Sequence, residues 1–212
     1  MNLDTSAVLW SAPERERAGR PLLVLLHGYG SHEGDLFSLS PALPLAPVVA
    51  SVRAPMSESG GFAWWSLDGA TPGAPDPEAV DAAATAVLDW LDTLDYTSVS
   101  ILGFSQGGAM TLQLLRHAPE RFAAAVCLSG FIATETHPGD ARLAEVRPPV
   151  FWGRGTSDPV IPAYAIERTT EWLPAHADAT TRIYEGLGHS ISTEELTDFA
   201  AFLGERAAGN AS

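Results

Sequence analysis

Apolar and polar residues follow two patterns along this chain, one of short apolar runs and one of longer amphipathic segments. Apolar runs of about four to eight residues are typical of buried strands, whereas apolar positions recurring every third or fourth residue indicate helices. The first pattern predicts strands at 6–10, 22–27, 47–53, 98–104, 123–129, 149–153 and 180–184. The second predicts helices at 35–42, 76–95, 106–117, 161–173 and 193–207.

The alternation of these elements predicts an α/β fold. Apolar strands that alternate with helices form a mainly parallel central sheet with helices on both faces, and functional residues gather at the carboxyl ends of the strands. The helix at 76–95 has Asp76 as a candidate N-cap, followed by Pro77 in the first turn. Because there is no internal repeat, low-complexity tract or long linker, we expect a single domain over 1–212, with a disordered tail over 207–212.

Composition narrows the class of protein. The chain has 212 residues, of which 46% are hydrophobic, and this suits one domain with a sizeable core. No segment approaches the roughly 18 consecutive apolar residues that a membrane-spanning helix needs. The N-terminal stretch lacks the basic and apolar parts of a signal peptide. A cytoplasmic location without a membrane anchor is therefore expected.

The charge excludes one class of partner. The formal net charge is −14, and all 12 cationic side chains are arginine. Such a chain repels nucleic acid, which binds basic patches, so no nucleic-acid partner is expected. The only cysteine, Cys127, lies in an apolar run and is expected to be a buried, inert thiol.

The pentapeptide Gly103-Phe104-Ser105-Gln106-Gly107 lies between a predicted strand and a predicted helix. This is the setting of a nucleophile elbow, a sharp turn that exposes a serine and needs glycine on either side. A G-x-S-x-G match occurs by chance in roughly one such chain in ten, but its position after a strand makes chance a poor explanation. We therefore expect Ser105 to be a nucleophile.

A serine nucleophile needs a base and a carboxylate, and in this type of fold the chain order is Ser, Asp or Glu, then His. His189 follows the strand at 180–184, and Asp158 follows the strand at 149–153. We expect His189 to be the general base and Asp158 the acid that orients it. Asp140 and Glu145 are the alternatives, although neither directly follows a strand. The other candidates, His117, His137 and His176, are expected to be solvated.

An oxyanion hole needs two converging backbone N–H groups. The Gln106 amide, at the start of a helix, is the first candidate. The second is the Tyr29 amide, because Gly28 and Gly30 on either side permit a tight turn after an early strand. The sequence contains no cluster of ligands with metal-site spacing and no phosphate-binding loop that ends in lysine, so neither a metal nor a cofactor is expected.

Several large apolar residues flank the ends of predicted strands, where they would line an apolar acyl pocket. These are Tyr29, Phe62, Trp64, Trp65, Phe131, Val160 and Ile161. The alternative for each is simple packing of a loop onto the core. The acidic residues Glu58 and Asp68 are interpreted as solvated loop positions.

Six stretches of the chain resemble, in order, the phospholipase/carboxylesterase family of α/β-hydrolases, which includes acyl-protein thioesterases. They are LLHGYGSHEGDLFSL, RAP followed by GGFAWWSL, LGFSQGGAM, LSGFI, PVFWGRGTSDPVIP and YEGLGHSISTEEL. The resemblance implies an α/β-hydrolase fold without a large lid domain, with Ser105, Asp158 and His189 as the triad and the Tyr29 and Gln106 amides as the oxyanion hole. Many members have leucine at the position of Tyr29, so its ring should narrow the pocket.

Together these features predict a serine carboxylesterase that cleaves esters of short to medium acyl chain through an acyl-serine intermediate. The expected partner is a small-molecule ester, and a homodimer is left open. Within the same class, acyl-thioesterase or lysophospholipase activity is the alternative. A hydrolase-like fold that only binds a ligand is the alternative from another class.

Overall fold

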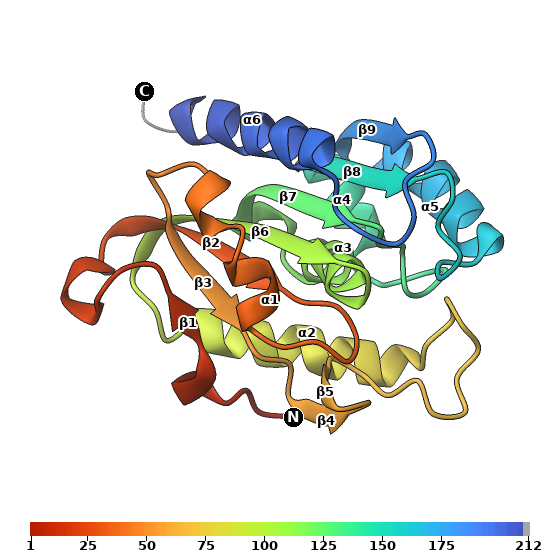
Figure 1. Cartoon of the computed structure of the whole chain (residues 1–212), viewed down its shortest axis with the longest axis horizontal. Coiled ribbons are helices and arrows are strands. Elements are labelled where there is room, and N and C mark those ends of the chain that lie inside the picture. The colour runs from red at the N-terminus through yellow and green to blue at the C-terminus, as the bar shows by residue number, and fades with distance from the viewer. Residues whose placement is uncertain (210–212) are drawn as a thin grey trace.

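The computed structural model describes residues 1–209, with side chains described as far as Arg206. A seven-stranded sheet runs through the centre of the molecule in the order β1-β3-β2-β6-β7-β8-β9 (Figure 1). Only β1 is antiparallel to its neighbour; the other strands pair in parallel. The strands of this sheet are β1 (Leu9–Trp10), β2 (Arg20–Leu26), β3 (Val48–Val52), β6 (Tyr96–Phe104), β7 (Phe122–Leu128), β8 (Pro149–Gly155) and β9 (Asp178–Tyr184).

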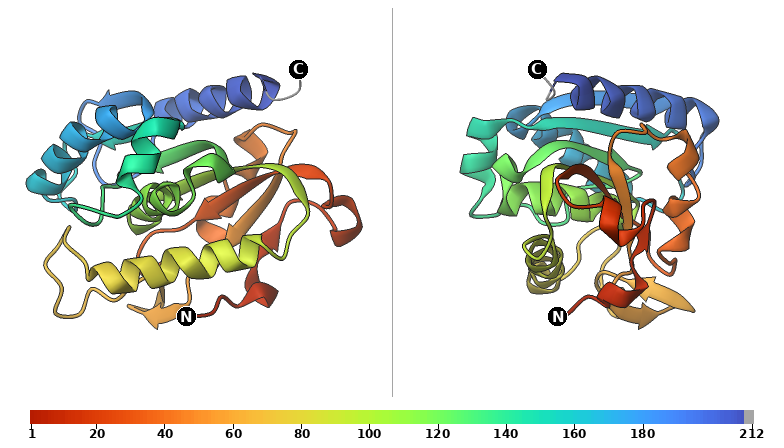
Figure 2. Two further views of the ribbon diagram at one scale, coloured as in Figure 1. Left: turned by 180° about the vertical axis from the view of Figure 1, so that it is seen from behind. Right: turned by 90° about the vertical axis from the view of Figure 1, so that its left-hand side faces the viewer.

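Helices cover both faces of this sheet, as the sequence predicts (Figure 2). One face packs against α2 (Pro77–Leu91), α3 (Gln106–His117) and α5 (Ala163–His176), and the other against α1 (Gly34–Phe37) and α6 (Thr193–Gly209). A short helix, α4 (Asp140–Val146), contacts α5. The α/β class and the mainly parallel sheet are therefore confirmed, and the described residues form no separate lid domain.

Each central strand supplies side chains to two separate apolar clusters, because successive side chains of a strand point to opposite faces. Leu22, Val24 and Leu26 of β2 pack in the cluster beneath α2, α3 and α5, whereas Leu23 and Leu25 pack beneath α1 and α6. This explains why the strands read as continuous apolar runs. Cys127 lies in the first cluster, and burial raises the pKa of its thiol to about 12, so the expectation of an inert cysteine holds.

The structure contains elements that the sequence pattern does not predict. The predicted helix at 35–42 divides into α1 and a 3-10 turn at Ser40–Ala42, since Pro41 has no N–H to continue the hydrogen bonding of an α-helix. A hairpin of β4 (Met56–Glu58) and β5 (Gly61–Ala63) follows β3, and α4 was not expected. Of the tail expected to be disordered, 207–209 continue α6, and 210–212 lie outside the described residues. Asp76 caps α2, as predicted, by accepting a hydrogen bond from the Glu78 amide.

No helix in the described part of the chain is long and apolar enough to cross a lipid bilayer.

Candidate active site

Ser105 occupies a one-residue turn between the end of β6 and the start of α3, as the elbow motif predicts. Its backbone has φ 56° and ψ −116°, a conformation that few residues with a side chain adopt. The Ser105 amide donates to the Leu128 carbonyl at 2.8 Å, and this bond to β7 holds the strained turn in place. A Cβ at Gly103 would overlap the Gly107 carbonyl, so the turn can form only with glycine at this position.

The start of α3 lies unusually close to the sheet. A Cβ at Gly107 would overlap the Leu26 carbonyl of β2, and Gly108 packs backbone to backbone against Gly130. Because the helix can approach so closely, its N-terminus points at the carboxyl ends of β2, β6 and β7. The partial positive charge of a helix N-terminus therefore lies beside Ser105.

The structure brings the three predicted triad residues together from three separate loops. Ser105 Oγ lies 2.9 Å from Nε2 of His189, and Nδ1 of His189 lies 2.7 Å from Oδ2 of Asp158. With the ring proton on Nδ1, His189 donates to Asp158 and accepts the proton of the Ser105 hydroxyl. The alternative acid Asp140 lies elsewhere, where it pairs with Arg116 at 2.8 Å.

The carboxylate of Asp158 is held from two sides. Its side chain is 3% exposed, and its Oδ1 accepts hydrogen bonds from the amides of Val160 at 2.8 Å and Ile161 at 3.2 Å. These bonds fix the orientation of the carboxylate and leave Oδ2 for His189. The ring of His189 also packs against Phe104, with 4.8 Å between ring centroids, so its position is set by packing as well as by hydrogen bonds.

Both predicted oxyanion donors lie at this end of the sheet. Among the described residues, the amide of Tyr29 has no acceptor, and the amide of Gln106 opens α3, where no intrahelical acceptor exists. The loop that carries Tyr29 is tied to β5, because Gly30 donates to the Phe62 carbonyl at 2.9 Å and Phe62 donates to Ser31 at 2.8 Å. Two unpaired N–H groups are therefore held near Ser105.

The phenol of Tyr29 is anchored by a residue that the sequence interpretation placed wrongly. Its hydroxyl donates to Oε1 of Glu58 at 2.8 Å, and this bond raises the pKa of the phenol. Glu58 Oε1 also accepts from Ser66 Oγ at 3.0 Å and from the Leu67 amide at 3.2 Å. Glu58 is thus not a solvated loop residue, since it joins the Tyr29 loop to the segment after β5.

The side chain of Gln106 has a structural position that the sequence reasoning missed. It is buried, with Oε1 accepting from the Trp64 amide at 2.9 Å and Nε2 donating to the Trp65 carbonyl at 2.8 Å. The indole N–H of Trp64 in turn donates to the carbonyl of His27 at 2.9 Å. Gln106 and the loop that begins at His27, which carry the two candidate oxyanion amides, are thus connected through Trp64.

His27 completes this connection as a neutral side chain. Its Nε2 accepts from the Ala54 amide at 3.1 Å, so the ring proton is on Nδ1, which donates to the Gly28 carbonyl at 2.7 Å. Burial lowers the pKa of His27, in agreement with a neutral ring. The stretch His27-Gly28-Tyr29-Gly30 can be recognised in the sequence, but the pairing of His27 with Ala54 cannot.

A family model described as phospholipase/carboxylesterase matches residues 11–206, nearly the whole chain. The chain belongs to the phospholipase/carboxylesterase family. It is 27% identical over 213 aligned residues to acyl-protein thioesterase 1 of Kluyveromyces lactis, covering 89% of this chain and 93% of that protein. The family is one of hydrolases, as expected.

Solved structures agree with this assignment. A carboxylesterase of Bacillus cereus superposes with a TM-score of 0.78 at 23% identity, covering 94% of this chain and 93% of that one. Acyl-protein thioesterase 2 of Zea mays superposes with a TM-score of 0.75 at 25% identity, covering 94% of this chain and 98% of that one. The α/β-hydrolase fold of this family member is therefore established.

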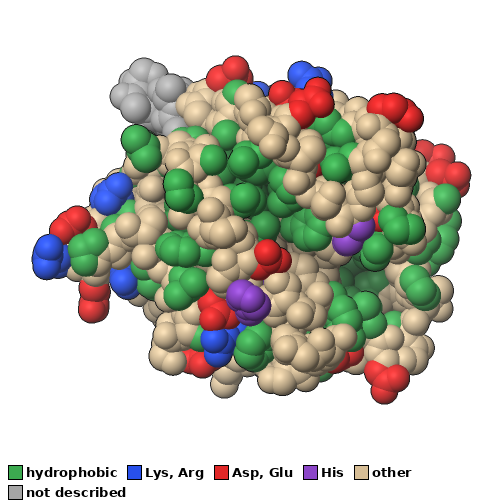
Figure 3. Space-filling view, viewed as in Figure 1, with side chains coloured by type: hydrophobic (Ala, Val, Ile, Leu, Met, Phe, Trp, Pro, Cys, Tyr) green, Lys and Arg blue, Asp and Glu red, His purple; other side chains and the backbone are tan. Residues whose placement is uncertain are grey.

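The predicted pocket residues have different environments in this family member. Trp64 and Trp65 are 0% and 1% exposed, so they fill the core instead of forming an open pocket wall. Phe131 and Ile161 are also buried, whereas Val160 is 53% exposed beside Asp158. Phe62 is half-buried under the guanidinium of Arg53. On the face seen in Figure 3, hydrophobic side chains border a hollow at the end toward which β6, β7 and β8 point.

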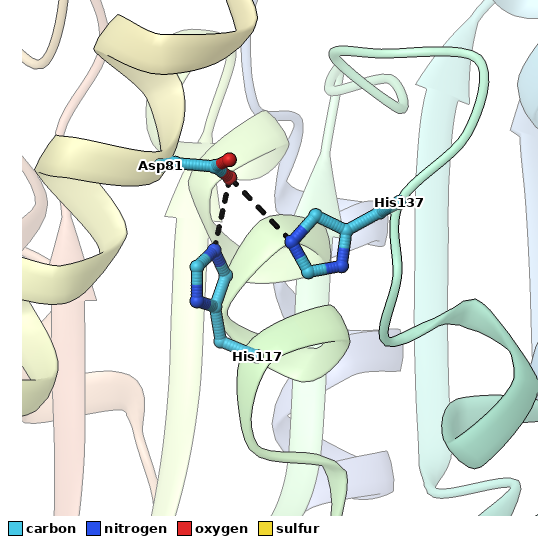
Figure 4. A group of neighbouring side chains, drawn as sticks. All are labelled: Asp81, His117 and His137. Carbon is cyan, nitrogen blue, oxygen red and sulfur yellow. Dashed lines mark hydrogen bonds and ion pairs between the residues drawn. The ribbon is translucent and has the colours of Figure 1, made fainter.

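A second cluster of polar residues lies away from the triad, where Asp81 of α2 meets His117 and His137 (Figure 4). Nε2 of His117 lies 2.9 Å from Asp81 Oδ1, and Nε2 of His137 lies 3.6 Å from it. These residue types bind metals, but Nδ1 of His137 accepts a hydrogen bond from the Gly139 amide at 3.0 Å. The neutral ring therefore has its proton on Nε2, where a metal would have to bind. The geometry fits a contact between α2, α3 and the 131–139 loop better than a metal site.

Proposed function

We propose that this protein is a serine carboxylesterase with Ser105 as nucleophile, His189 as general base and Asp158 as the orienting acid. The observation that supports the proposal most strongly is the continuous hydrogen-bonded path from Ser105 Oγ through His189 to Asp158, on a turn between β6 and α3. A structural turn does not require a buried carboxylate and an imidazole aligned on its serine.

The reaction follows from this arrangement. As Ser105 Oγ attacks the ester carbonyl, its proton passes to Nε2 of His189, and the Tyr29 and Gln106 amides bind the oxygen that becomes negative. His189 then protonates the departing alcohol oxygen, which leaves an acyl-serine. Water attacks this intermediate after giving a proton to His189, the acid is released, and Ser105 regains its proton. Asp158 stabilises the imidazolium in both halves.

A short to medium acyl chain is part of this proposal. Trp64 and Trp65 fill the core beside the elbow, and Phe131 and Ile161 are buried on the same face of the sheet. These packed side chains leave little room for a long acyl tail on this side. A thioester presents the same carbonyl to Ser105 and is the alternative substrate, as the name of the Kluyveromyces relative suggests.

The experiment is fluorophosphonate labelling combined with hydrolysis of p-nitrophenyl esters of increasing acyl length. We expect a single labelled site at Ser105 and loss of both labelling and activity, by a factor of about 10⁴ or more, in Ser105→Ala. Ser57→Ala, at an exposed position of β4, is the matched control and should behave like the unchanged protein. A panel of S-acyl substrates run alongside ranks thioesters against esters.

The proposal would be contradicted if the folded protein is never labelled at Ser105 and hydrolyses no ester faster than the Ser105→Ala variant does. That outcome would favour a ligand-binding protein with a hydrolase fold. Highest activity on long-chain esters would contradict the acyl-length part alone.

A further inference from the structure

A groove of about 240 Å³ lies beside His189, between α1 and the loop that leads into α6. Its apolar wall comes from Leu36, Leu39, Phe104 and Ile191, and the ring of His189 with Asp35, Ser38 and Ser190 completes the lining. In the view of Figure 3, hydrophobic side chains also gather over the region between α1 and α6. The volume matches that of about eight water molecules, which is room for a small organic group.

This groove lies on the opposite face of the sheet from the residues expected to contact the acyl chain. Leu36, Leu39, Phe104 and Ile191 belong to the cluster beneath α1 and α6, whereas Phe131 and Ile161 belong to the cluster beneath α3 and α5. Ser105 lies at the edge of the sheet between the two clusters. The carbonyl carbon of an ester carries the acyl chain on one side and the alcohol portion on the other. The two faces of the sheet therefore offer a separate site for each.

The position of His189 indicates which part of the ester, the acyl chain or the alcohol, lies in the groove. Its Nε2 must protonate the oxygen of the departing alcohol, so this oxygen has to lie next to the imidazole ring. The same ring forms a wall of the groove and packs on Phe104, which also lines it. The alcohol side of the ester therefore has the shorter path into the groove.

We propose that this groove binds the alcohol portion of the ester, and that it selects an apolar alcohol without negative charge. This inference rests on the proposed esterase function. The apolar wall of the groove favours alkyl or aryl alcohols over small polar ones.

The rim of the groove supplies the charge selection. Asp35 lies there with its Oδ2 accepting from Ser31 Oγ at 2.6 Å, and it has no cationic partner among the described residues. The cation on the neighbouring strand end, Arg53, is already paired with Glu33 at 2.7 Å. An anionic leaving group would thus be repelled by the Asp35 carboxylate, whereas a neutral or cationic one would not.

Two matched ester series test the assignment, with hydrolysis followed by acid release in a pH-stat so that no chromophore is needed. One series holds the acyl group as butyryl and lengthens the alcohol from methanol to hexanol; the other holds methanol and lengthens the acyl group. For the unchanged protein we expect kcat/KM to rise about two- to fourfold for each methylene added to the alcohol.

Leu39→Trp fills the groove and should remove this rise, lowering kcat/KM for hexyl butyrate at least tenfold while changing the methyl esters less than threefold. Leu45→Trp, at a position that is 88% exposed, is the matched control and should leave both series unchanged. If Leu39→Trp instead lowers activity on long acyl chains, or if neither series responds, the assignment is wrong. Because methyl esters report the triad itself, their turnover separates this failure from a failure of the proposed function.

A pair of isosteric alcohols tests the charge selection. Butyrylcholine and 3,3-dimethylbutyl butyrate have the same shape, but the first is cationic and the second neutral. A third butyrate ester, whose alcohol ends in a carboxylate, is the anionic substrate. We expect the anionic ester to be the slowest, and Asp35→Asn to raise its kcat/KM about threefold relative to the neutral ester. No change in this ratio would overturn the role of Asp35.

Discussion

At the scale of single residues, the indole of Trp64 joins two parts of the site that are distant in sequence. Its ring N–H bonds to the His27 carbonyl, and its backbone amide bonds to the side chain of Gln106. His27 and Gln106 each lie at or near a candidate oxyanion amide, so small movements of Trp64 would change the orientation of the two amide N–H groups. Misplacing such groups by about 1 Å can lower a rate about a hundredfold.

We therefore expect Trp64→Phe, which keeps the ring but removes its N–H, to lower kcat about tenfold with little change in KM, because the amides matter most once the oxyanion forms. The unpaired His27 carbonyl should also lower the free energy of unfolding by about 1–3 kcal/mol. Steady-state kinetics and urea denaturation measure the two effects. Trp90→Phe on α2, far from the site, is the control for the smaller ring and should leave kcat unchanged. An equal fall in kcat for both variants would contradict a positioning role.

The sequence predicted that Ser105, Asp158 and His189 lie together, because each follows a strand and parallel strands end at one edge of a sheet. It did not predict the roles of the Gln106 side chain, of His27 or of Glu58. The Gln106 side chain bonds to the segment just after β5, His27 bonds to Ala54 just beyond β3, and Glu58 lies on β4. Strands of three residues, such as β4 and β5, leave no apolar pattern to detect. Buried polar contacts of this kind depend on tertiary structure and have no local signal.

At the scale of elements, the first turn of α6 places a carboxyl group inside the molecule. Glu195 is 0% exposed, and neither of its oxygens has a hydrogen-bond partner among the described residues. A Cβ at Gly153 would overlap Glu195 Oε1, so glycine in β8 is what lets the carboxyl lie against the strand. Burial, with a smaller effect of the Asp198 charge, raises the pKa of Glu195 to about 7.

This raised pKa links stability to pH with a definite sign. Between the ordinary value of 4.5 and about 7, the folded chain keeps a proton that the unfolded chain has released, so the free energy of unfolding falls as the pH rises. Over this whole pH range, the free energy of unfolding falls by about 3 kcal/mol. The side chain of the Glu195→Gln variant cannot titrate. Relative to the unchanged protein, the free energy of unfolding of this variant should therefore rise by up to that amount between pH 4.5 and 8.

Urea unfolding at several pH values measures this difference. Glu194→Gln, at the exposed neighbouring position, is the matched control and should run parallel to the unchanged protein. Parallel curves for Glu195→Gln as well would contradict the raised pKa.

Helix and strand predictions succeeded where the apolar pattern was long and failed where it was short. The helix predicted at 106–117 matches α3 in both bounds, because glycine-rich packing and continuous apolar residues mark it clearly. The bounds of α5 differ by two to three residues from those predicted, since Pro162 rather than Ile161 precedes the helix and Pro174 is accommodated in its last turn. The seven-residue α4 was missed, because a single buried residue, Leu143, gives no periodicity.

At the scale of the whole molecule, the net charge of −14 affects which substrates approach. We expect kcat/KM for an acyl-coenzyme A, whose leaving group is polyanionic, to rise at least threefold between 10 mM and 0.5 M salt, because the screening length falls from about 30 Å to a few ångströms. The matching S-acyl N-acetylcysteamine is neutral and should show no such rise. Stopped assays of free thiol measure both, and equal salt dependence would contradict electrostatic repulsion.

The separation of the core into two clusters by the central sheet also bears on how this protein could be changed by directed evolution. Substitutions around α1 and the start of α6 share few neighbours with those around α5 and the 131–139 loop, and effects at distant sites usually add. Libraries built on the two faces can therefore be selected separately and then recombined. Within the elbow, by contrast, Gly103 and Gly107 admit no side chain, so diversity introduced there would be lost at the folding step.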